Sequence, residues 1–257
     1  MQNLNKSNYP ARGIKGYIME NVLHAGIVLP LINQKGGVSK TTMAHTLARE
    51  LAKSNKVLLI DFDGQATLTE LIDLYSHYEK EFLDKYLIEN SILKIFNRES
   101  ITPLNITDII EKNFKTENQI NALHFIPSPG NSLSSIAESV AGGKDLLLKN
   151  FLKTIKYDYD FIVIDSLPSV STLFKNVLLA ADSIIIPIQT KTNSIAGANE
   201  FIKVIDEVIG DYDTTYNNLF ILPTMYNKQR RDDKDVLAEI KTSYLDFIQS
   251  CNHIGKV

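Results

Sequence analysis

Short runs of apolar residues alternate along the chain with segments in which apolar residues recur every three or four positions. Each run is continuously apolar and has the length of a buried strand. The runs are GIVLPLIN, KVLLID, LHFIPS, DFIVIDS, SIIIPIQ and NLFILPT, which begin at Gly26, Lys56, Leu123, Asp160, Ser183 and Asn218. The segments with helical spacing are residues 40–54, 65–74, 133–141, 145–155, 172–180, 196–209 and 232–249. This alternation predicts an α/β fold, a mostly parallel twisted sheet with helices on both faces.

Two stretches depart from this alternation. Residues 1–25 are polar and contain Pro10, Gly13 and Gly16, which predicts an N-terminal arm with one short helix over residues 18–23. Residues 76–120 are rich in charge and asparagine, and we expect them to form a mostly helical insertion. The pattern otherwise runs through residues 26–257, so we expect one large domain.

Composition narrows the class of protein. Hydrophobic residues make up 44% of the chain and charged residues 22%, as in ordinary soluble proteins. The net charge of −3 gives no chain-wide reason to expect nucleic acid, so a nucleic-acid surface would have to be a local patch. Cys251 is the only cysteine, which excludes a disulfide within one chain and a cysteine-based metal cluster. Because the sequence also has neither a membrane-length apolar run nor a signal-peptide pattern, we expect a cytoplasmic protein.

The stretch LINQKGGVSKTT, residues 31–42, lies between the first predicted strand and the first predicted helix. It nearly matches the phosphate-binding loop G-x-x-x-x-G-K-[ST], but Gln34 and Ser39 stand where that pattern has glycine. If the backbone at Ser39 has a positive φ, a serine there is strained by about 1 kcal/mol or more. We expect its hydroxyl to compete with phosphate oxygens for backbone N–H groups at the helix start.

The other residues of this loop fit phosphate binding. Gly36 and Gly37 allow the backbone to turn its N–H groups inward, and the start of the helix adds its positive end. Lys40 can then reach the β- and γ-phosphates of a nucleotide, with the Thr41 hydroxyl on Mg²⁺. The competing interpretation is a glycine-rich turn followed by a lysine on an exposed helix start.

Acidic residues end two of the predicted strands. Asp61 and Asp63 follow the strand KVLLID, and Asp165 ends the strand DFIVIDS. Ligands bind at the carboxyl ends of parallel strands in open α/β sheets, and an aspartate in the position of Asp165 commonly holds Mg²⁺. Each segment alone could hold a helix-capping aspartate. The order of loop, paired aspartates and strand-end aspartate favours a nucleotide site.

These motifs resemble those of the ParA family of plasmid and chromosome partitioning ATPases, in the MinD/ParA group with a deviant Walker A motif. The resemblance covers about residues 26–249, and residues 76–120 match least. The matching stretches are NQKGGVSKTT, LLIDFDGQATLT, FIVIDSLPS, IIIPIQT and ILPTMYNKQ. The resemblance implies a P-loop NTPase fold, with ATP and Mg²⁺ as cofactors.

The resemblance also implies a role for each motif residue. Lys35 would reach across a dimer interface to the phosphates of the partner, while Lys40 serves its own nucleotide. Asp63 would position the attacking water, and Asp61 and Asp165 would serve the Mg²⁺ side. The implied catalytic residues are thus Lys35, Lys40 and Asp63, and the implied metal ligands are Thr41, Asp61 and Asp165. The implied nucleotide-binding residues are Lys35, Gly36, Gly37, Val38, Ser39, Lys40, Thr41, Thr42 and Met225, with Thr42 near the α-phosphate.

Three features depart from the family pattern. Ser39 replaces a glycine, and the family motif DAPPS is DSLPS here, which places Ser166 and Leu167 after the strand-end aspartate. The sequence ends at CNHIGKV, before the final strand, adenine-contacting loop and last helix that the family normally has. We therefore expect those C-terminal elements to be missing.

The function that the resemblance implies is a DNA-partitioning switch. ATP would close a homodimer that binds DNA without sequence preference in the nucleoid, and a ParB-like partner would stimulate slow hydrolysis. The basic patch proposed for DNA is Lys228, Arg230, Arg231, Lys234 and Lys241, and a second candidate patch is Lys144, Lys149, Lys153 and Lys156. A solvated helix start, with Asp232 and Asp233 cancelling the charge of the first patch, is the competing interpretation.

Two other functions remain open from the sequence. A MinD-like membrane-surface ATPase needs a basic amphipathic helix. The apolar stripe of residues 232–249 has acidic flanks and no basic tail after it, so we expect it to pack on the sheet, without stable membrane association. A metabolic enzyme of the same superfamily is disfavoured by the single cysteine and by the lack of a recognisable small-substrate motif.

Overall fold

The computed structural model of the protein describes residues 25–114, 120–130, 133, 135, 144–167, 171–191 and 193–250, apart from the side chains of residues 114, 193–196 and 241–250. The helix predicted over residues 18–23 lies outside these ranges, as does most of the helix predicted over residues 133–141. No helix in the described part of the chain is long and apolar enough to cross a membrane.

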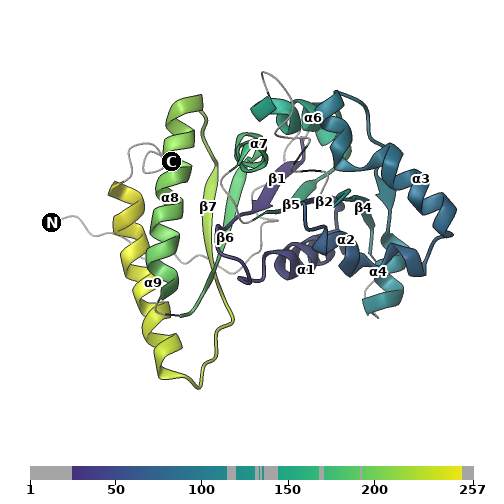
Figure 1. The fold of residues 1–257 in the computed structure, drawn as a ribbon. Helices are drawn as coiled ribbons and strands as arrows, with labels where there is room; N and C mark the ends of the chain where they lie inside the picture. The colour runs from purple at the N-terminus through teal and green to yellow at the C-terminus, as the bar shows by residue number, and fades with distance from the viewer. Residues whose placement is uncertain are drawn as a thin grey trace.

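A seven-stranded sheet in the order β3-β4-β2-β5-β1-β6-β7 forms the centre of the molecule (Figure 1). The strands are β1 (Ile27–Leu31), β2 (Lys56–Phe62), β3 (Leu104–Asn105), β4 (Ala122–Ile126), β5 (Phe161–Ser166), β6 (Ser183–Gln189) and β7 (Asn218–Thr224). Every neighbouring pair is parallel except β3 and β4, which are antiparallel. The predicted mostly parallel sheet is therefore confirmed.

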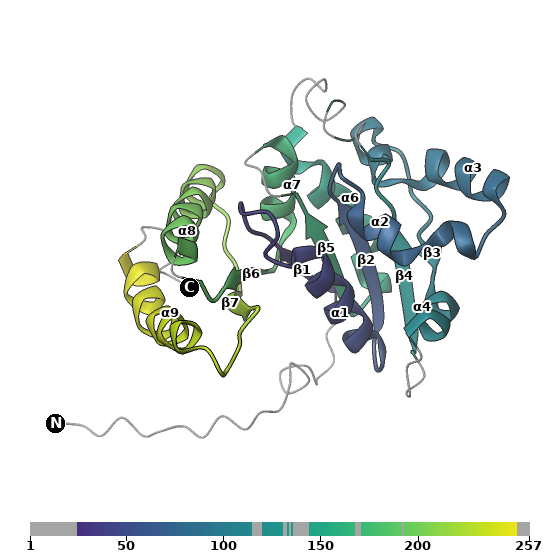
Figure 2. The same cartoon turned by 60° about the horizontal axis from the view of Figure 1, so that its bottom comes forward.

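Helices cover both faces of the sheet (Figures 1 and 2). On one face lie α1 (Lys40–Ala52), α2 (Thr67–Ile72) and α4 (Thr107–Phe114), and on the other lie α6 (Leu147–Ile155) and α7 (Thr172–Ala180). The long helices α8 (Asn193–Tyr212) and α9 (Arg231–Ser250) lie side by side near β7 in both views. Short 3₁₀ helices also lie between these elements, among them η2 (Leu74–Ser76), η4 (Lys144–Leu146) and η5 (Lys156–Asp158).

Successive residues of each central strand enter opposite cores, because side chains alternate between the two faces of a sheet. Leu58 of β2 and Ile162 of β5 belong to the core under α6, α7 and α8, while Leu59 and Val163 belong to the core under α1 and α4. All four side chains are fully buried. This two-sided burial explains why the strands read as continuously apolar runs.

The stretch 76–120 contains α3 (Lys80–Asn90), the 3₁₀ helix η3 (Ile92–Asn97), β3 and α4. Ile92, Ile95 and Phe96 of η3 are buried in the core under α6, α7 and α8. Part of this stretch therefore belongs to the hydrophobic core and is not a surface insertion. The edge strand β3 was not predicted, since two residues are too few to show a period-two pattern.

The topology brings three strand ends together. The chain passes from β1 through α1 to β2 and skips β5, which lies between these strands, so the strand order reverses beside β1. Ligands bind at such a switch point, outside the carboxyl ends of the strands. In the register of the sheet, Asp165 of β5 pairs with Leu31 of β1 on one side and with Asp61 of β2 on the other. The predicted loop and two of the predicted acids therefore meet at one edge.

Candidate functional site

The chain leaves β1 through a turn of residues 32–39 and enters α1 directly. Gly37 has a φ of +72° and Ser39 a φ of 70°, so both lie in the left-handed region. A Cβ at Gly36 or Gly37 would meet no atom within 4 Å, which leaves open space beside this turn. Ser39 is the N-cap of α1 but makes no capping hydrogen bond through its side chain. The expected competition of its hydroxyl for helix N–H groups is therefore not seen, whereas the strained backbone is.

Polar side chains at the ends of two neighbouring strands hold the turn from outside. The side-chain nitrogen of Gln189, the last residue of β6, donates to the carbonyl of Gly37 at 2.7 Å. The Thr224 hydroxyl, at the end of β7, donates to the carbonyl of Val38 at 3.3 Å. Both side chains are buried. The carbonyls of the turn are thereby directed toward the sheet.

A third side chain of this kind belongs to the turn itself. The Asn33 amide nitrogen donates to the carbonyl of Pro187 in β6 at 2.6 Å, and its amide oxygen accepts from the backbone N–H of Lys35 at 2.8 Å. Asn33, Gln189 and Thr224 were not among the predicted site residues. Each ends an apolar strand run, in VLPLIN, IIIPIQ and FILPT, and that was the signal available in the sequence.

The amine of Lys40 lies inside this turn. Its Nζ donates to the carbonyls of Asn33 at 3.0 Å and Lys35 at 3.3 Å, and the residue is only 7% exposed. Burial lowers the pKa of Lys40, while the nearby carboxylates of Asp165 and Asp63 raise it. The lysine is thus a buried cation held by backbone carbonyls, at the loop position where the phosphate-binding motif places its lysine.

Asp165 is the most unusual group of the site. Its side chain is 1% exposed, and neither carboxylate oxygen has a hydrogen-bond partner with ordinary geometry among the described residues. Burial raises the pKa of Asp165 to about 7; the neighbouring Thr41 hydroxyl and Lys40 lower it, and Asp61 and Asp63 raise it further. A buried carboxylate costs several kcal/mol unless it is paired or binds a metal. A buried carboxylate without a partner of ordinary geometry, beside a threonine hydroxyl and a phosphate-binding loop, fits Mg²⁺, which prefers oxygen ligands.

Asp61 differs from Asp165 because its oxygens are occupied. They accept from the backbone N–H of Asp63 at 3.2 Å and from the backbone N–H and hydroxyl of Thr69 at 2.8 and 2.7 Å. Burial raises the pKa of Asp61 to about 6, against the lowering effect of these hydrogen bonds. In this arrangement Asp61 holds the loop that joins β2 to α2, and a part in metal binding would be indirect.

Asp63 lies on that loop and is only half-buried. One of its carboxylate oxygens accepts from the backbone N–H of Gln65 at 2.9 Å. The charge of Asp63 raises the pKa of both Lys40 and Asp165, so the three groups belong to one cluster. The predicted residues Lys40, Thr41, Asp61, Asp63 and Asp165 therefore do come together.

Other predicted residues lie at the margin of this cluster. Lys35, Gly36, Gly37 and Thr42 are exposed. A cavity of about 230 Å³, bordered by Lys35, Val38 and the first turns of α8, adjoins the loop. Met225 is 55% exposed and follows Thr224, the residue bonded to the loop.

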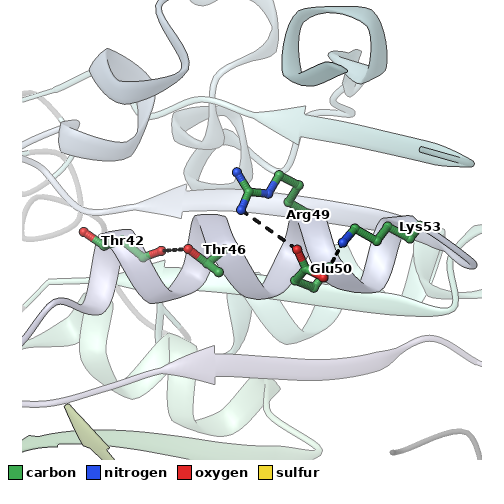
Figure 3. Close-up of polar contacts among 5 residues, drawn as sticks. All are labelled: Thr42, Thr46, Arg49, Glu50 and Lys53. Carbon is green, nitrogen blue, oxygen red and sulfur yellow. Dashed lines mark hydrogen bonds and ion pairs between the residues drawn. The ribbon is translucent and has the colours of Figure 1, made fainter. Parts of the chain in front are cut away.

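The outer face of α1 is held by local polar contacts (Figure 3). The Thr46 hydroxyl donates to the carbonyl of Thr42 at 2.7 Å, and Glu50 pairs with Lys53 at 2.6 Å and with Arg49 at 3.9 Å. Surface pairs of this kind contribute about 0–1 kcal/mol each. The inner face of α1 is formed by small residues, since Ala44, Ala48 and Ala52 are fully buried there. The helix can therefore approach the sheet closely.

Comparisons with known proteins agree with this geometry. Residues 26–219 match the protein family described as an AAA domain. The chain is 29% identical to the chromosome-partitioning ATPase Soj of Treponema pallidum, over 87% of this chain and 81% of that protein.

Two solved structures are also similar. A putative plasmid partition protein from Borrelia burgdorferi, bound to AMPPNP, shares 29% identity at a TM-score of 0.67, covering 84% of this chain and 83% of that one. Cobyrinic acid a,c-diamide synthase from Mycobacterium smegmatis, with bound ADP and magnesium, shares 26% identity at a TM-score of 0.62, covering 84% of this chain and 81% of that one.

Proposed function

The chain belongs to this AAA domain family as a ParA-type partitioning ATPase, and we propose that it works as an ATP-driven switch that segregates a plasmid or a chromosome. In this proposal ATP closes a homodimer that binds DNA without sequence preference in the nucleoid. A ParB-like partner then stimulates slow hydrolysis and releases the DNA.

The observation that supports ATP chemistry most directly is the buried, unpartnered carboxylate of Asp165 beside a buried lysine. Each group alone is unfavourable in a protein interior, and together they suit a ligand that brings both a cation and phosphate oxygens. Thr41 and Asp165 would hold Mg²⁺, which would neutralise charge on the phosphates. The nucleotides in the similar solved structures support the same ligand class for this chain.

The side chains of the site divide the remaining work. Lys40 would bind the β- and γ-phosphates of its own nucleotide, in place of the backbone carbonyls that it contacts here. Asp63 would orient the attacking water, and positioning with charge neutralisation supplies most of the rate in phosphoryl transfer. Lys35 is exposed at a cavity that α8 borders with Gly197 and Ala198, and from there it would reach the phosphates of a second subunit.

The DNA surface is proposed at the loop before α9 and the first turn of α9. Lys228, Arg230, Arg231 and Lys234 are all exposed there, and the side chain of Lys241, the fifth residue of the predicted patch, lies outside the described residues. Asp233, which could have cancelled their charge, is 6% exposed and accepts from the backbone N–H of Asn227 at 2.7 Å. One acid of the helix start is thus used to shape the loop, and the four exposed cations outnumber the exposed acids beside them, Asp232 and Asp235.

Helix α9 argues against the alternative of a membrane-surface ATPase. Val236 and Ile240 of the α9 stripe are 4% and 5% exposed and belong to the core cluster that includes α8. Because these two side chains are buried, they are not available to insert into a bilayer surface.

Phosphate release with Mg²⁺ and ATP, with and without duplex DNA at matched salt, tests the proposal. We expect slow hydrolysis by the wild-type protein, ATP-dependent shift of the DNA and no ATP-dependent pelleting with anionic vesicles. Lys40→Ala is the control and should lose nucleotide binding in calorimetry, because it removes the charge that faces the phosphates. Unchanged affinity of Lys40→Ala would refute the phosphate-loop assignment, and vesicle pelleting without a DNA shift would favour the membrane alternative.

A further inference from the structure

The loop that carries Asp63 is fastened to a neighbouring strand by one buried serine. Ser128 follows β4, and β4 pairs in parallel with β2 as far as Ile60 and Ile126. The chain after β4 therefore emerges beside the chain after β2, at the edge of the sheet that carries the nucleotide site. Ser128 is 3% exposed.

Ser128 makes two contacts with the Asp61–Thr69 segment. Its hydroxyl donates to the carbonyl of Asp63 at 2.6 Å and accepts from the backbone N–H of Gly130 at 3.2 Å. Its backbone N–H donates to the Thr69 hydroxyl at 3.1 Å, and that hydroxyl donates to Asp61 at 2.7 Å. A continuous chain of hydrogen bonds thus links the loop after β4 to both aspartates.

The turn that Ser128 holds is strained. The carbonyl of Asp63 also accepts from the backbone N–H of Ala66 at 3.0 Å, and Ala66 has a φ of 52°. A non-glycine residue in the left-handed region is unfavourable and persists only where the surroundings fix it. The bond from Ser128 comes from outside the turn, so it can supply that constraint.

We propose that Ser128 is a positioning residue for Asp63: its hydroxyl fixes the backbone of the Asp63 turn and so keeps the carboxylate where it orients the attacking water. The inference rests on the proposed ATP hydrolysis and on the role given there to Asp63. Ser128 itself would contact neither the nucleotide nor the attacking water. Its loss should therefore slow the chemical step and leave nucleotide affinity unchanged, because an error in placement of about 1 Å is enough to slow a reaction.

The test compares three variants of the full chain. Ser128→Ala should lower kcat about fivefold to tenfold, with the AMPPNP dissociation constant in Mg²⁺ within about twofold of the wild type. Ser128→Thr keeps the hydroxyl and should restore kcat to within about twofold; Ser128 borders a cavity of about 480 Å³, toward which the added methyl can turn. Ser91→Ala is the matched control, because Ser91 is 1% exposed and borders the same cavity but makes no side-chain capping bond.

The outcomes separate this inference from the proposed function. Wild-type kcat in Ser128→Ala, equal losses in Ser128→Ala and Ser91→Ala, or no recovery in Ser128→Thr would each overturn the positioning role while ATP hydrolysis stands. If Ser128→Ala does not fold, Ser128→Cys replaces it, with the same expected loss of kcat at unchanged affinity. Absence of phosphate release by the wild-type protein would instead refute the proposed function.

Discussion

The substitution Ser39→Gly tests whether the serine in the phosphate loop strains the backbone and weakens nucleotide binding. Ser39 has φ 70° and ψ 26°, and its side chain makes no capping bond to α1. A non-glycine residue in this region is strained by roughly 1–2 kcal/mol. Glycine removes that strain but widens the unfolded ensemble, which costs about 0.4–1 kcal/mol. The free energy of unfolding should therefore rise by up to about 1.6 kcal/mol.

Nucleotide affinity should respond through the fraction of loops in the phosphate-ready conformation. Strain at Ser39 lowers the fraction of molecules whose loop has the left-handed conformation at this residue. A ligand that needs this conformation binds less tightly, in proportion to that fraction. If the full relief of about 1.4 kcal/mol appears in binding, affinity rises about tenfold. We expect Ser39→Gly to bind ATP more tightly than the wild type, by tenfold or less.

Calorimetric titration with ATP and Mg²⁺, beside thermal melts of the free proteins, measures both effects. Ser39→Ala is the matched control, because it keeps the Cβ and removes only the hydroxyl. Since the hydroxyl makes no capping bond, Ser39→Ala should bind ATP like the wild type. Weaker binding by the glycine form would mean that the serine is an adapted ligand. Equal tightening by alanine and glycine would assign the effect to the hydroxyl, and either result refutes the strain argument.

Three further predictions concern other parts of the site. Asp63→Ala should keep ATP bound but slow phosphate release and prolong the dimer in size-exclusion chromatography, because only water positioning is lost; failure to dimerise with ATP would contradict the role of Asp63. Charge reversal at Arg230 and Arg231 should weaken DNA binding and lower the slope of log affinity against log salt by about 2; an unchanged slope would place the patch elsewhere, with Lys149 and its neighbours as the next candidates. Asp165→Asn should raise the free energy of unfolding of the nucleotide-free protein by about 1–3 kcal/mol, and it should abolish the stabilisation by Mg²⁺ and ATP. Lower stability of the nucleotide-free variant would contradict this, because it would show that the protein itself stabilises the carboxylate.

The fold was predictable where a strand is buried on both faces. Such strands are continuously apolar, and the predicted start of the run SIIIPIQ at Ser183 coincides with the first residue of β6. The helix predicted over residues 172–180 likewise matches α7. The helix predicted over residues 65–74 is shorter, Thr67–Ile72, because Ala66 and Asp73 on either side have positive φ values that interrupt it. A positive φ at a single residue cannot be predicted from the spacing of apolar residues.

The acids and the lysine of the site were predictable because a motif fixes their spacing. The groups that hold them in place were not, since their contacts span long stretches of sequence. Gln189 reaches Gly37 across 152 positions, and Ser128 reaches Asp63 across 65. Only the parallel sheet brings these residues together. A polar residue at the end of an apolar strand run is therefore a site candidate in its own right, because the carboxyl ends of parallel strands meet the ligand.

Ser166 shows how a departure from the family motif can be structural rather than chemical. The DSLPS stretch places this serine directly after Asp165, where the resemblance implies alanine. The Ser166 hydroxyl donates to the carbonyl of Leu31 at 2.7 Å, and the side chain is 1% exposed. Leu31 is the last residue of β1, so its carbonyl lies where the strand gives way to the phosphate loop. A carbonyl buried there needs a donor. Because the serine supplies it, this substitution secures the start of the loop.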